Sequence, residues 1–261
     1  MLICPKCKNE LKKIDRSWKC INNHCFDIAK RGYVNLVLGS SKGSGDDKEM
    51  VRSRTNFLSH GYYQNLRSAV SDIVTHLELH TIVDAGCGEG YYTNYIKQQH
   101  EDADMYGFDL SKFAVDEACK AHCGVMYGVC NIFHLPLSDA SCDGVLSVFA
   151  PIDIDENARV LKSGGYFIKV APGPKHLWEL KKEIYPDVYE NEIEVGYPGF
   201  ECIKEELLTN QIHIDHQTDI WSLFQMTPYY WRTPLKQAEH LKSLTELDTT
   251  TQFHITVYRK K

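Results

Sequence analysis

Residues 81–92 read T-I-V-D-A-G-C-G-E-G-Y-Y, and this stretch constrains the fold more than any other part of the chain. A short apolar run ends in Asp84, and every second residue is then glycine, at Gly86, Gly88 and Gly90. Apolar residues followed by glycines at this spacing indicate a buried parallel strand that runs into a tight turn. The turn leaves the backbone open to a ligand, and the helix expected from about residue 91 directs its N-terminal amides toward it.

A second hydrophobic run, 105–108, ends in Asp109, nineteen positions after Gly90. In doubly wound sheets an acidic residue about 20 positions after the glycine turn binds the ribose hydroxyls of a nucleotide. The third glycine comes one residue too early for the dinucleotide pattern G-x-G-x-x-G. The spacing G-x-G-x-G after Asp84 resembles the S-adenosylmethionine site of class I methyltransferases. A purely structural glycine turn is the alternative.

The remaining composition is that of an ordinary globular protein. The 261 residues allow one full α/β domain and a small additional domain. No apolar stretch approaches the roughly 18–20 residues that span a bilayer, and we find no secretory signal pattern at the N-terminus. Several of the ten cysteines, such as Cys87, Cys119 and Cys142, fall in expected core elements. We therefore expect reduced cysteines and a cytoplasmic protein.

The charge is distributed unevenly. Residues 1–60 carry a net charge of +6 and residues 61–261 carry −12, within a total of −6. A basic front end on an acidic body suits a protein that places its front end against phosphates. The alternative is a charge asymmetry without a function.

The first residues contain the pattern C-x2-C-x12-C-x3-H, formed by Cys4, Cys7, Cys20 and His24. Two close pairs of such ligands bind tetrahedral zinc, and with no position open to water the metal is structural. Cys25 in place of His24 is the alternative fourth ligand. About twenty-five residues could not bury a core without such a metal.

Composition also suggests the domain boundaries. We expect a zinc-binding head for RNA recognition at 1–38, a linker and connecting helix at 39–60, and the methyltransferase domain at 61–261. Residues 26–36 are expected to complete a small sheet around the zinc, and the glycine- and serine-rich segment 39–48 to be a loop.

Local patterns predict the remaining elements. A helix should place Met50, Phe57 and Leu58 on one face and leave Arg52 and Arg54 open to solvent or phosphate. The next helix packs on the sheet through an apolar stripe at helical spacing. Ser111 should cap a further helix whose Phe113, Ala114 and Ala118 point inward. The later strands are expected at 125–129, 143–149, 167–170, 201–208 and 253–259.

Motifs along nearly the whole chain resemble the bacterial 23S rRNA guanine-N1 methyltransferases, in the same order. They are C-x2-C-x12-C-x3-H, F-D-I-A-K-R-G-Y-V-N-L from Phe26, G-D-D-K-E-M-V-R-S-R-T-N-F-L-S-H-G-Y-Y from Gly45, D-A-G-C-G-E-G-Y-Y-T from Asp84, G-F-D-L-S-K from Gly107, L-P-L-S-D from Leu135, A-P-G-P-K-H-L from Ala171 and F-Q-M-T-P-Y-Y-W-R from Phe224. The glycine motif alone would indicate only a class I methyltransferase.

The resemblance implies an α/β fold of the class I methyltransferase, Rossmann-like type: a seven-stranded, mostly parallel sheet with helices on both faces, plus the small zinc-binding domain. It implies methylation of a guanine in a hairpin loop of 23S rRNA, macrolide resistance in some members, and a homodimer whose two heads frame the RNA. The implied cofactors are S-adenosylmethionine and structural Zn²⁺. The implied cofactor-binding residues are Tyr63, Asp84, Gly86, Gly88, Gly90, Tyr91, Asp109, Asn131 and His176.

An acid is common at the position of Asn131, next to the adenine, and here it is an amide. Tyr63 and His176 could be an aromatic anchor and a surface residue. Trp221, Phe224, Tyr229, Tyr230 and Trp231 are expected to be partly core, and some could stack on RNA bases.

The chemistry expected is an in-line transfer of the sulfonium methyl to guanine N1, helped mainly by alignment. Guanine N1 carries a proton near neutral pH, so a group must accept it. Asp153 and Asp155 lie in the right region, but no pattern fixes either as the base. The alternatives are a small-molecule methyltransferase with an accessory zinc ribbon, and a non-catalytic zinc-dependent RNA-binding module.

Overall fold

The computed structural model describes residues 1–39 and 45–261, so part of the expected 39–48 loop lies outside the described residues. Its centre is an eight-stranded sheet with the order β10-β11-β9-β8-β5-β6-β7-β4. The strands are β4 (Val34–Asn35), β5 (Thr81–Ala85), β6 (Asp104–Asp109), β7 (Met126–Val129), β8 (Cys142–Val148), β9 (Leu161–Pro172), β10 (Phe200–Ile214) and β11 (Leu247–Lys260). All neighbours are parallel except β11, which pairs antiparallel with both β9 and β10.

The strand order reverses between β5 and β8. From β5 the chain proceeds outward to β6 and β7, and then returns to β8 on the other side of β5. In open α/β sheets ligands bind at this switch point, beyond the carboxyl ends of the strands. The predicted later strands are all present, and β10 and β11 are longer than expected.

The sheet contains an eighth strand, β4, in addition to the seven that were expected. Residues 26–36 were expected to complete the small zinc sheet. Only part of this segment does so, as β3 (Cys25–Asp27), which pairs with β2 (Ser17–Lys19); β1 (Lys12–Ile14) is the third strand. Val34 instead pairs with Gly128 of β7 and is 1% exposed. It covers the backbone edge that β7 would otherwise expose.

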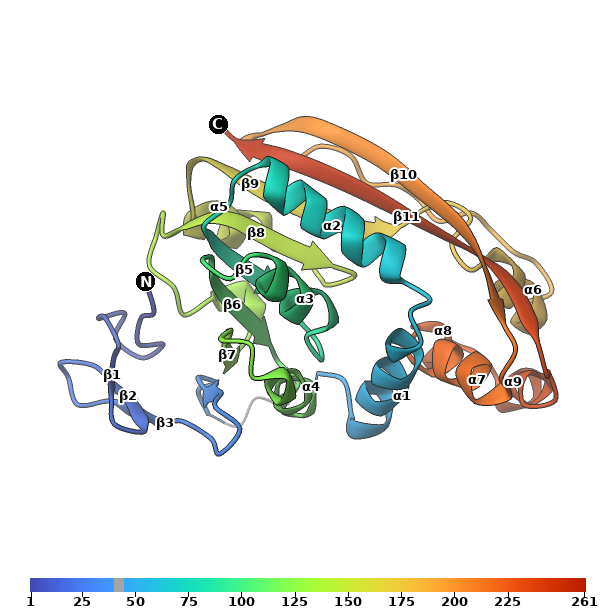
Figure 1. The fold of residues 1–261 in the computed structure, drawn as a ribbon, viewed down its shortest axis with the longest axis horizontal. Coiled ribbons are helices and arrows are strands. Elements are labelled where there is room, and N and C mark those ends of the chain that lie inside the picture. Colours follow the sequence, from blue (N-terminus) through green and yellow to red (C-terminus); the bar gives the residue numbers. More distant parts are fainter. Residues whose placement is uncertain (40–44) are drawn as a thin grey trace.

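Nine α-helices surround the sheet in the described parts of the chain. They are α1 (Lys48–Ser59), α2 (Gln64–His76), α3 (Tyr91–Gln99), α4 (Lys112–Ala118), α5 (Ile154–Val160), α6 (Trp178–Ile184), α7 (Gln217–Gln225), α8 (Tyr229–Arg232) and α9 (Leu235–Leu241), with 3₁₀ turns η1 (Cys119–Ala121) and η2 (Ile132–His134). Figure 1 shows α2 and α3 across the near face of the sheet, the β1–β3 head at one end and α7–α9 beside α1 at the other. No helix among the described residues has the length and apolar composition needed to cross a membrane.

Strand alternation divides the core between the two faces of the sheet. Ile82 of β5 belongs to the cluster that packs under α2 and α3, with Leu66 and Ile96. Its neighbour Val83 belongs to the other cluster, which includes Leu2 and Leu11 of the zinc head. The head is therefore a layer of the second face. None of the ten cysteines, all within the described residues, forms a disulfide in this structure.

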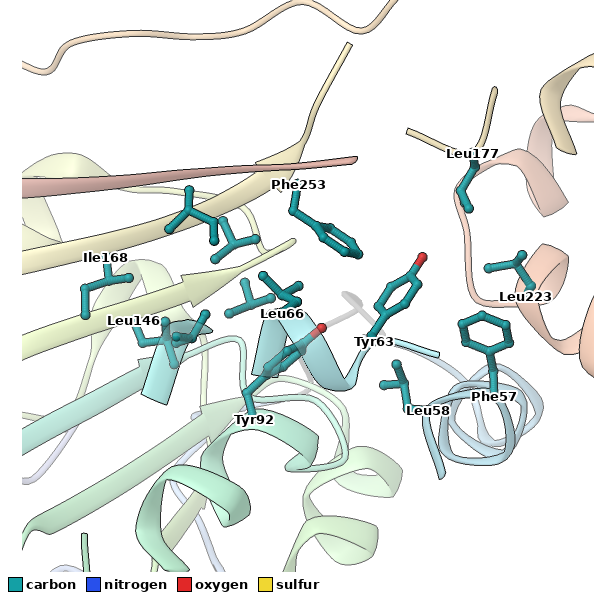
Figure 2. Packing of buried hydrophobic residues seen from close by; sticks show 14 of the residues in the cluster. Phe57, Leu58, Tyr63, Leu66, Tyr92, Leu146, Ile168, Leu177, Leu223 and Phe253 are labelled. Atoms are coloured by element: carbon teal, nitrogen blue, oxygen red, sulfur yellow. The ribbon is translucent and has the colours of Figure 1, made fainter. Parts of the chain in front are cut away.

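The first cluster extends from the sheet to α1. Figure 2 shows Leu146 and Ile168 of the sheet to the left of Leu66, and Tyr63 between Leu66 and Phe57 of α1. Phe57 and Leu58 are buried as predicted for the α1 face, at 0% and 4% exposure. Ile220, Leu223 and Phe224 of α7 belong to the same cluster, so the C-terminal helices help to fix α1.

The α4 prediction is confirmed at its cap and partly wrong at its buried face. Ser111 caps the helix by accepting a hydrogen bond from the Ala114 amide. Ala114 and Ala118 are buried, but Phe113 is 53% exposed. Val115 points inward instead, because it lies three residues before Ala118 and so shares the same face of the helix. Phe113, the second residue of the helix, faces away from this buried side.

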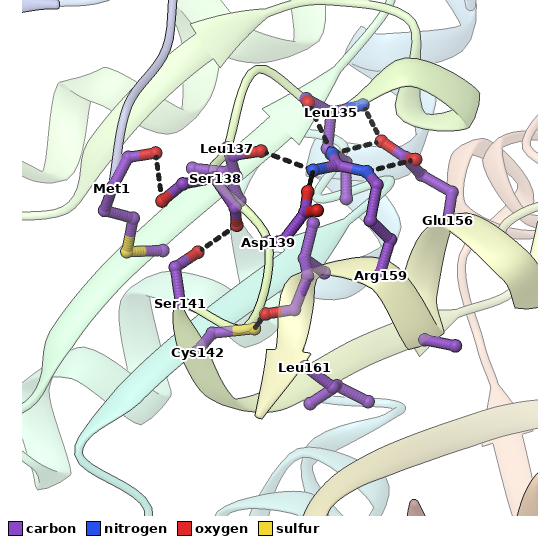
Figure 3. A network of polar contacts seen from close by, with 12 residues as sticks. Met1, Leu135, Leu137, Ser138, Asp139, Ser141, Cys142, Glu156, Arg159 and Leu161 are labelled. Atoms are coloured by element: carbon purple, nitrogen blue, oxygen red, sulfur yellow. Dashed lines mark hydrogen bonds and ion pairs between the residues drawn. The ribbon is translucent and has the colours of Figure 1, made fainter. Parts of the chain in front are cut away.

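The N-terminal backbone is attached to the loop that follows η2. Ile3 N donates to Pro136 O at 2.8 Å, and Ser138 N donates to Met1 O at 2.8 Å. Arg159 fixes this loop, because its guanidinium donates to Leu137 O and Leu135 O and pairs with Glu156 and Asp139 (Figure 3). These hydrogen bonds raise the pKa of Arg159, with Glu156 the main partner. The L-P-L-S-D motif is thus a docking site for the head.

Candidate functional site

The glycine loop lies where the switch point predicts, between the end of β5 and the start of α3. Gly86 and Gly90 have φ values of +92° and +81°, which disfavour a side chain. A β-carbon on Gly86 would lie 2.3 Å from the Ala150 β-carbon, and one on Gly90 would lie 2.8 Å from the Tyr127 hydroxyl. Gly90 caps α3 without a side chain, so the first-turn amides are left for another acceptor.

Two predicted carboxylates lie beside this loop, at the ends of adjacent strands. Asp84 is 2% exposed, and its Oδ2 accepts a hydrogen bond from Thr93 Oγ1 at 2.5 Å. Burial raises the pKa of Asp84 to about 7. Asp109 Oδ2 accepts from Gly88 N at 3.0 Å and its Oδ1 accepts from Ser111 N at 2.7 Å. Burial also raises the pKa of Asp109, against these two backbone donors.

A buried ion-pair cluster covers the loop, and the sequence analysis missed it. Arg54 of α1 pairs with Asp46 at 2.5 Å and with Glu89 at 3.6 Å. Its Nη1 would be 3.5 Å from a β-carbon on Gly88. Arg54 was expected to be open to solvent or phosphate, but its side chain is only 22% exposed. Glu89, inside the glycine motif, could have predicted this cluster, because a buried acidic side chain in such a loop requires a cation as its partner.

The loop also concentrates polar atoms that make no hydrogen bond, although one of them, Glu89 Oε2, lies 3.6 Å from Arg54 Nη1. Six buried side-chain polar atoms make no hydrogen bond within the described residues, and five of them lie on β5, the glycine loop, α3 or Arg67 of α2. These five are Arg67 Nε, Asp84 Oδ1, Glu89 Oε2, Tyr91 Oη and Tyr92 Oη. The Arg67 guanidinium stacks on the Tyr91 ring. Buried polar groups are nearly always satisfied in native proteins. The cluster therefore fits a polar ligand that offers both donors and acceptors to it.

Tyr63 and His176, predicted to bind the cofactor, are packed against each other behind this edge. Tyr63 is 3% exposed and His176 is 6% exposed, and Tyr63 Oη is 3.4 Å from His176 Nε2. His176 Nδ1 accepts from Gln252 N at 3.2 Å, so the neutral ring carries its proton on Nε2. Burial lowers the pKa of His176 to about 3. His176 is therefore neutral near pH 7, and both of its nitrogens are engaged.

The other residues considered from the sequence have local roles. Asn131, exposed beyond β7, accepts a hydrogen bond from Phe133 N through its Oδ1 and caps η2. Asp153 caps α5 by accepting from Glu156 N at 3.0 Å. Asp155 is exposed in the first turn of α5. The structure therefore identifies neither Asp153 nor Asp155 as a base.

The metal-ligating atoms of Cys4, Cys7, Cys20 and His24 lie within 4.8 Å of one another. Tetrahedral zinc, with Zn–S of about 2.3 Å and Zn–N of about 2.0 Å, separates two sulfurs by roughly 3.8 Å and sulfur from nitrogen by roughly 3.5 Å. Cys7 and Cys20 Sγ are 3.7 Å apart, and Cys4 and Cys20 Sγ are 3.4 and 3.5 Å from His24 Nδ1. Cys25 is exposed and outside this group. The four residues fit zinc, with His24 in the fourth position.

Two family models match separate parts of the chain. The zinc-ribbon model described as RlmA, N-terminal, matches residues 2–44, and a methyltransferase domain model matches residues 83–169. The first match includes β4, which belongs to the large sheet. The methyltransferase match runs from β5 to β9 and contains the glycine loop and Asp109.

Curated relatives extend this similarity to the full length. The chain is 32% identical to the 23S rRNA (guanine(748)-N(1))-methyltransferase of Streptomyces fradiae, over 88% of this chain and 85% of the relative. It is 30% identical to YxjB of Bacillus subtilis (strain 168), provisionally named a 23S rRNA (guanine-N(1)-)-methyltransferase, over 100% and 97%. A malonyl-[acyl-carrier protein] O-methyltransferase of Hahella chejuensis matches only 39% of each chain, at 32% identity. The chain therefore belongs to the 23S rRNA (guanine-N1)-methyltransferase family, as the sequence motifs predicted.

Proposed function

We propose that this protein transfers the methyl group of S-adenosylmethionine to N1 of a guanine in a hairpin loop of 23S rRNA. The observation that carries the proposal is the coexistence, in one chain with full-length relatives of that name, of a zinc-ligand cluster and a glycine loop with unsatisfied polar atoms. A small-molecule methyltransferase would need the loop but not the head.

Each cofactor-binding residue would then have a distinct role. Asp84 and Glu89 offer negative charge to the positively charged methionine end, and the α3 amides receive its carboxylate. Asp109 keeps lone pairs for the ribose hydroxyls beyond the two amides that it already accepts from. Gly86 and Gly90 shape the loop, because their lack of a β-carbon lets its backbone pack closely on Ala150 and Tyr127. S-adenosylmethionine, when bound, supplies an activated methyl group.

The protein's share of the chemistry is alignment and exclusion of water. A well-oriented pair of reactants can lower the barrier by up to about 7–11 kcal/mol. Guanine N1 lies on the base-pairing edge, so the base must be unpaired or flipped to react, and a loop guanine meets this condition. His176 cannot accept the N1 proton, because both of its nitrogens are engaged and its pKa is about 3.

Binding of S-adenosylmethionine should depend on pH through Asp84. Its pKa of about 7 means that the carboxyl is largely protonated below pH 7. A cationic ligand favours the deprotonated form, so binding releases a proton and affinity rises with pH up to about 7, by at most tenfold per pH unit. Calorimetry between pH 5.5 and 7.5, in buffers of different ionisation enthalpy, measures both effects. The Asp84→Asn variant should show neither, and a flat wild-type profile would contradict this role.

Cellular rRNA provides a test of the function itself. Large-subunit rRNA from cells lacking this protein should lose one 1-methylguanosine, as measured by nucleoside mass spectrometry. Wild-type protein should restore it and Asp109→Asn should not. Unchanged 1-methylguanosine would exclude the proposal. The guanine that the Streptomyces fradiae relative is named for, 748, is the first position to inspect.

The head and the oligomeric state complete the proposal. We expect the head to contact the hairpin, because residues 1–60 carry the positive charge. We further propose a homodimer in which two heads frame one hairpin, acting in the cytoplasm where rRNA is modified. Light scattering after gel filtration, with and without an RNA hairpin, measures the dimer directly.

A further inference from the structure

Phe149 follows β8 at the carboxyl edge of the sheet, and its backbone has a disfavoured conformation. Its φ is +55°, a region that residues with a β-carbon rarely adopt. Its ring is 42% exposed although the preceding strand is almost wholly buried. Strain of this kind persists only where the surroundings enforce it, and it is frequent at functional sites.

Neighbouring contacts place Phe149 next to the cofactor loop. The following residue, Ala150, packs on Gly86, whose added β-carbon would lie 2.3 Å away. Phe149 N donates to Val170 O at 3.0 Å, so β9 holds the turn from the other side. Phe149 therefore lies beside the first glycine of the loop, on the side toward β9.

A rigid aromatic cluster supports one side of the Phe149 ring. Its centroid is 5.9 Å from both the His176 and the Phe253 rings. Those two rings are 5.1 Å apart, and Tyr63 packs on both. His176 and Phe253 are buried, at 6% and 1% exposure. Phe149 is thus the solvent-facing member of a packed aromatic cluster.

We propose that Phe149 stacks on the target guanine and positions it for methyl transfer. A planar base laid on this ring has one face covered and its edge, which carries N1, free to meet the methyl group. Aromatic side chains hold splayed RNA bases in this manner. The strained turn orients the ring toward the reaction side. This inference rests on the proposed function.

Substitutions at position 149 distinguish the stacking of a planar ring on the base from the mere filling of space by an apolar side chain. Phe149→Ala should lower kcat/KM for an unmodified rRNA hairpin by roughly 5- to 150-fold, the range observed for losing a base–aromatic stack. The dissociation constant for S-adenosylmethionine should change less than twofold. Phe149→Tyr should keep near-normal activity, and Phe149→Leu, apolar but not planar, should fall as far as alanine. Leu207→Ala, a half-exposed apolar residue of β10, is the matched control.

A second substitution controls for folding. Phe149→Asn removes the ring but tolerates the left-handed backbone, so it should melt within a few degrees of wild type and still lose activity. Full activity in Phe149→Ala, or rescue by leucine equal to that by tyrosine, would overturn the stacking role. Equal losses in cofactor affinity and in kcat/KM would also overturn the stacking role, because Phe149 would then act by binding the cofactor. If wild-type protein itself forms no 1-methylguanosine, the proposed function fails first.

Discussion

Replacing Asp109 by asparagine should raise the dissociation constant for S-adenosylmethionine roughly 10- to 150-fold, the loss of one hydrogen bond to a charged group at about 1.5–3 kcal/mol. Both carboxylate oxygens already accept backbone amides, from Gly88 and Ser111. The amide of asparagine turns one of these acceptors into a donor that faces an N–H group. The substitution therefore removes the proposed ribose acceptor and also loosens the glycine loop.

A control substitution on the same strand distinguishes a loss of cofactor binding from a loss of folding. Asp104 begins β6 and is exposed, whereas Asp109 ends it. Asp104→Asn should bind S-adenosylmethionine as wild type does. Calorimetric titration of both variants, with circular dichroism to show that each is folded, measures the difference. Wild-type affinity in Asp109→Asn would mean that the end of β6 does not hold the ribose.

Replacing Cys20 by serine should release zinc and lower rRNA methylation at least 100-fold. Structural zinc contributes about 10–16 kcal/mol in small zinc-binding peptides, as much as the entire stability of many domains, about 5–15 kcal/mol. Without the metal, residues 1–39 lose what holds their three short strands together. Leu2 and Leu11 then leave the cluster that they share with Val83. Hydrogen exchange in residues 1–39 should rise accordingly.

Cys25 is the matched control for the metal site, because it was the rival fourth ligand. Its side chain is exposed and lies outside the four-residue cluster. Cys25→Ser should keep one zinc per chain by elemental analysis and keep full activity, whereas His24→Ala should lose both. The opposite pattern would assign the fourth position to Cys25. S-adenosylmethionine binding should change less than tenfold in Cys20→Ser, since the glycine loop is formed by β5, β6 and α3.

The sequence predicted the relative positions of those residues that have a fixed spacing along the chain. The positions of Asp84, the three glycines and Asp109 follow from strand-turn-helix geometry, and the structure brings them to one edge. The zinc cluster follows equally from close pairs of ligands. The later strands followed from apolar runs bounded by turn residues, although their ends were placed too early or too late.

Contacts between distant segments could not be read from the same patterns. Arg54 was expected on a solvated face, because its helix pattern does not reveal that Asp46 and Glu89 surround it. Residues 34–35 were assigned to the zinc sheet, since nothing local indicates that β7 has a free edge. The left-handed backbone of Phe149 is equally invisible, because phenylalanine gives no signal for positive φ. Each of these depends on tertiary context.

Methylation of unmodified 23S rRNA in vitro tests the central claim most directly. Purified protein with zinc and isotopically labelled S-adenosylmethionine should place one labelled methyl group on each rRNA. Digestion should recover it as 1-methylguanosine, and primer extension should stop at a single loop guanine, because the methyl group blocks base pairing. Label on another atom or nucleotide, or no transfer by a protein that binds both zinc and S-adenosylmethionine, would contradict the account.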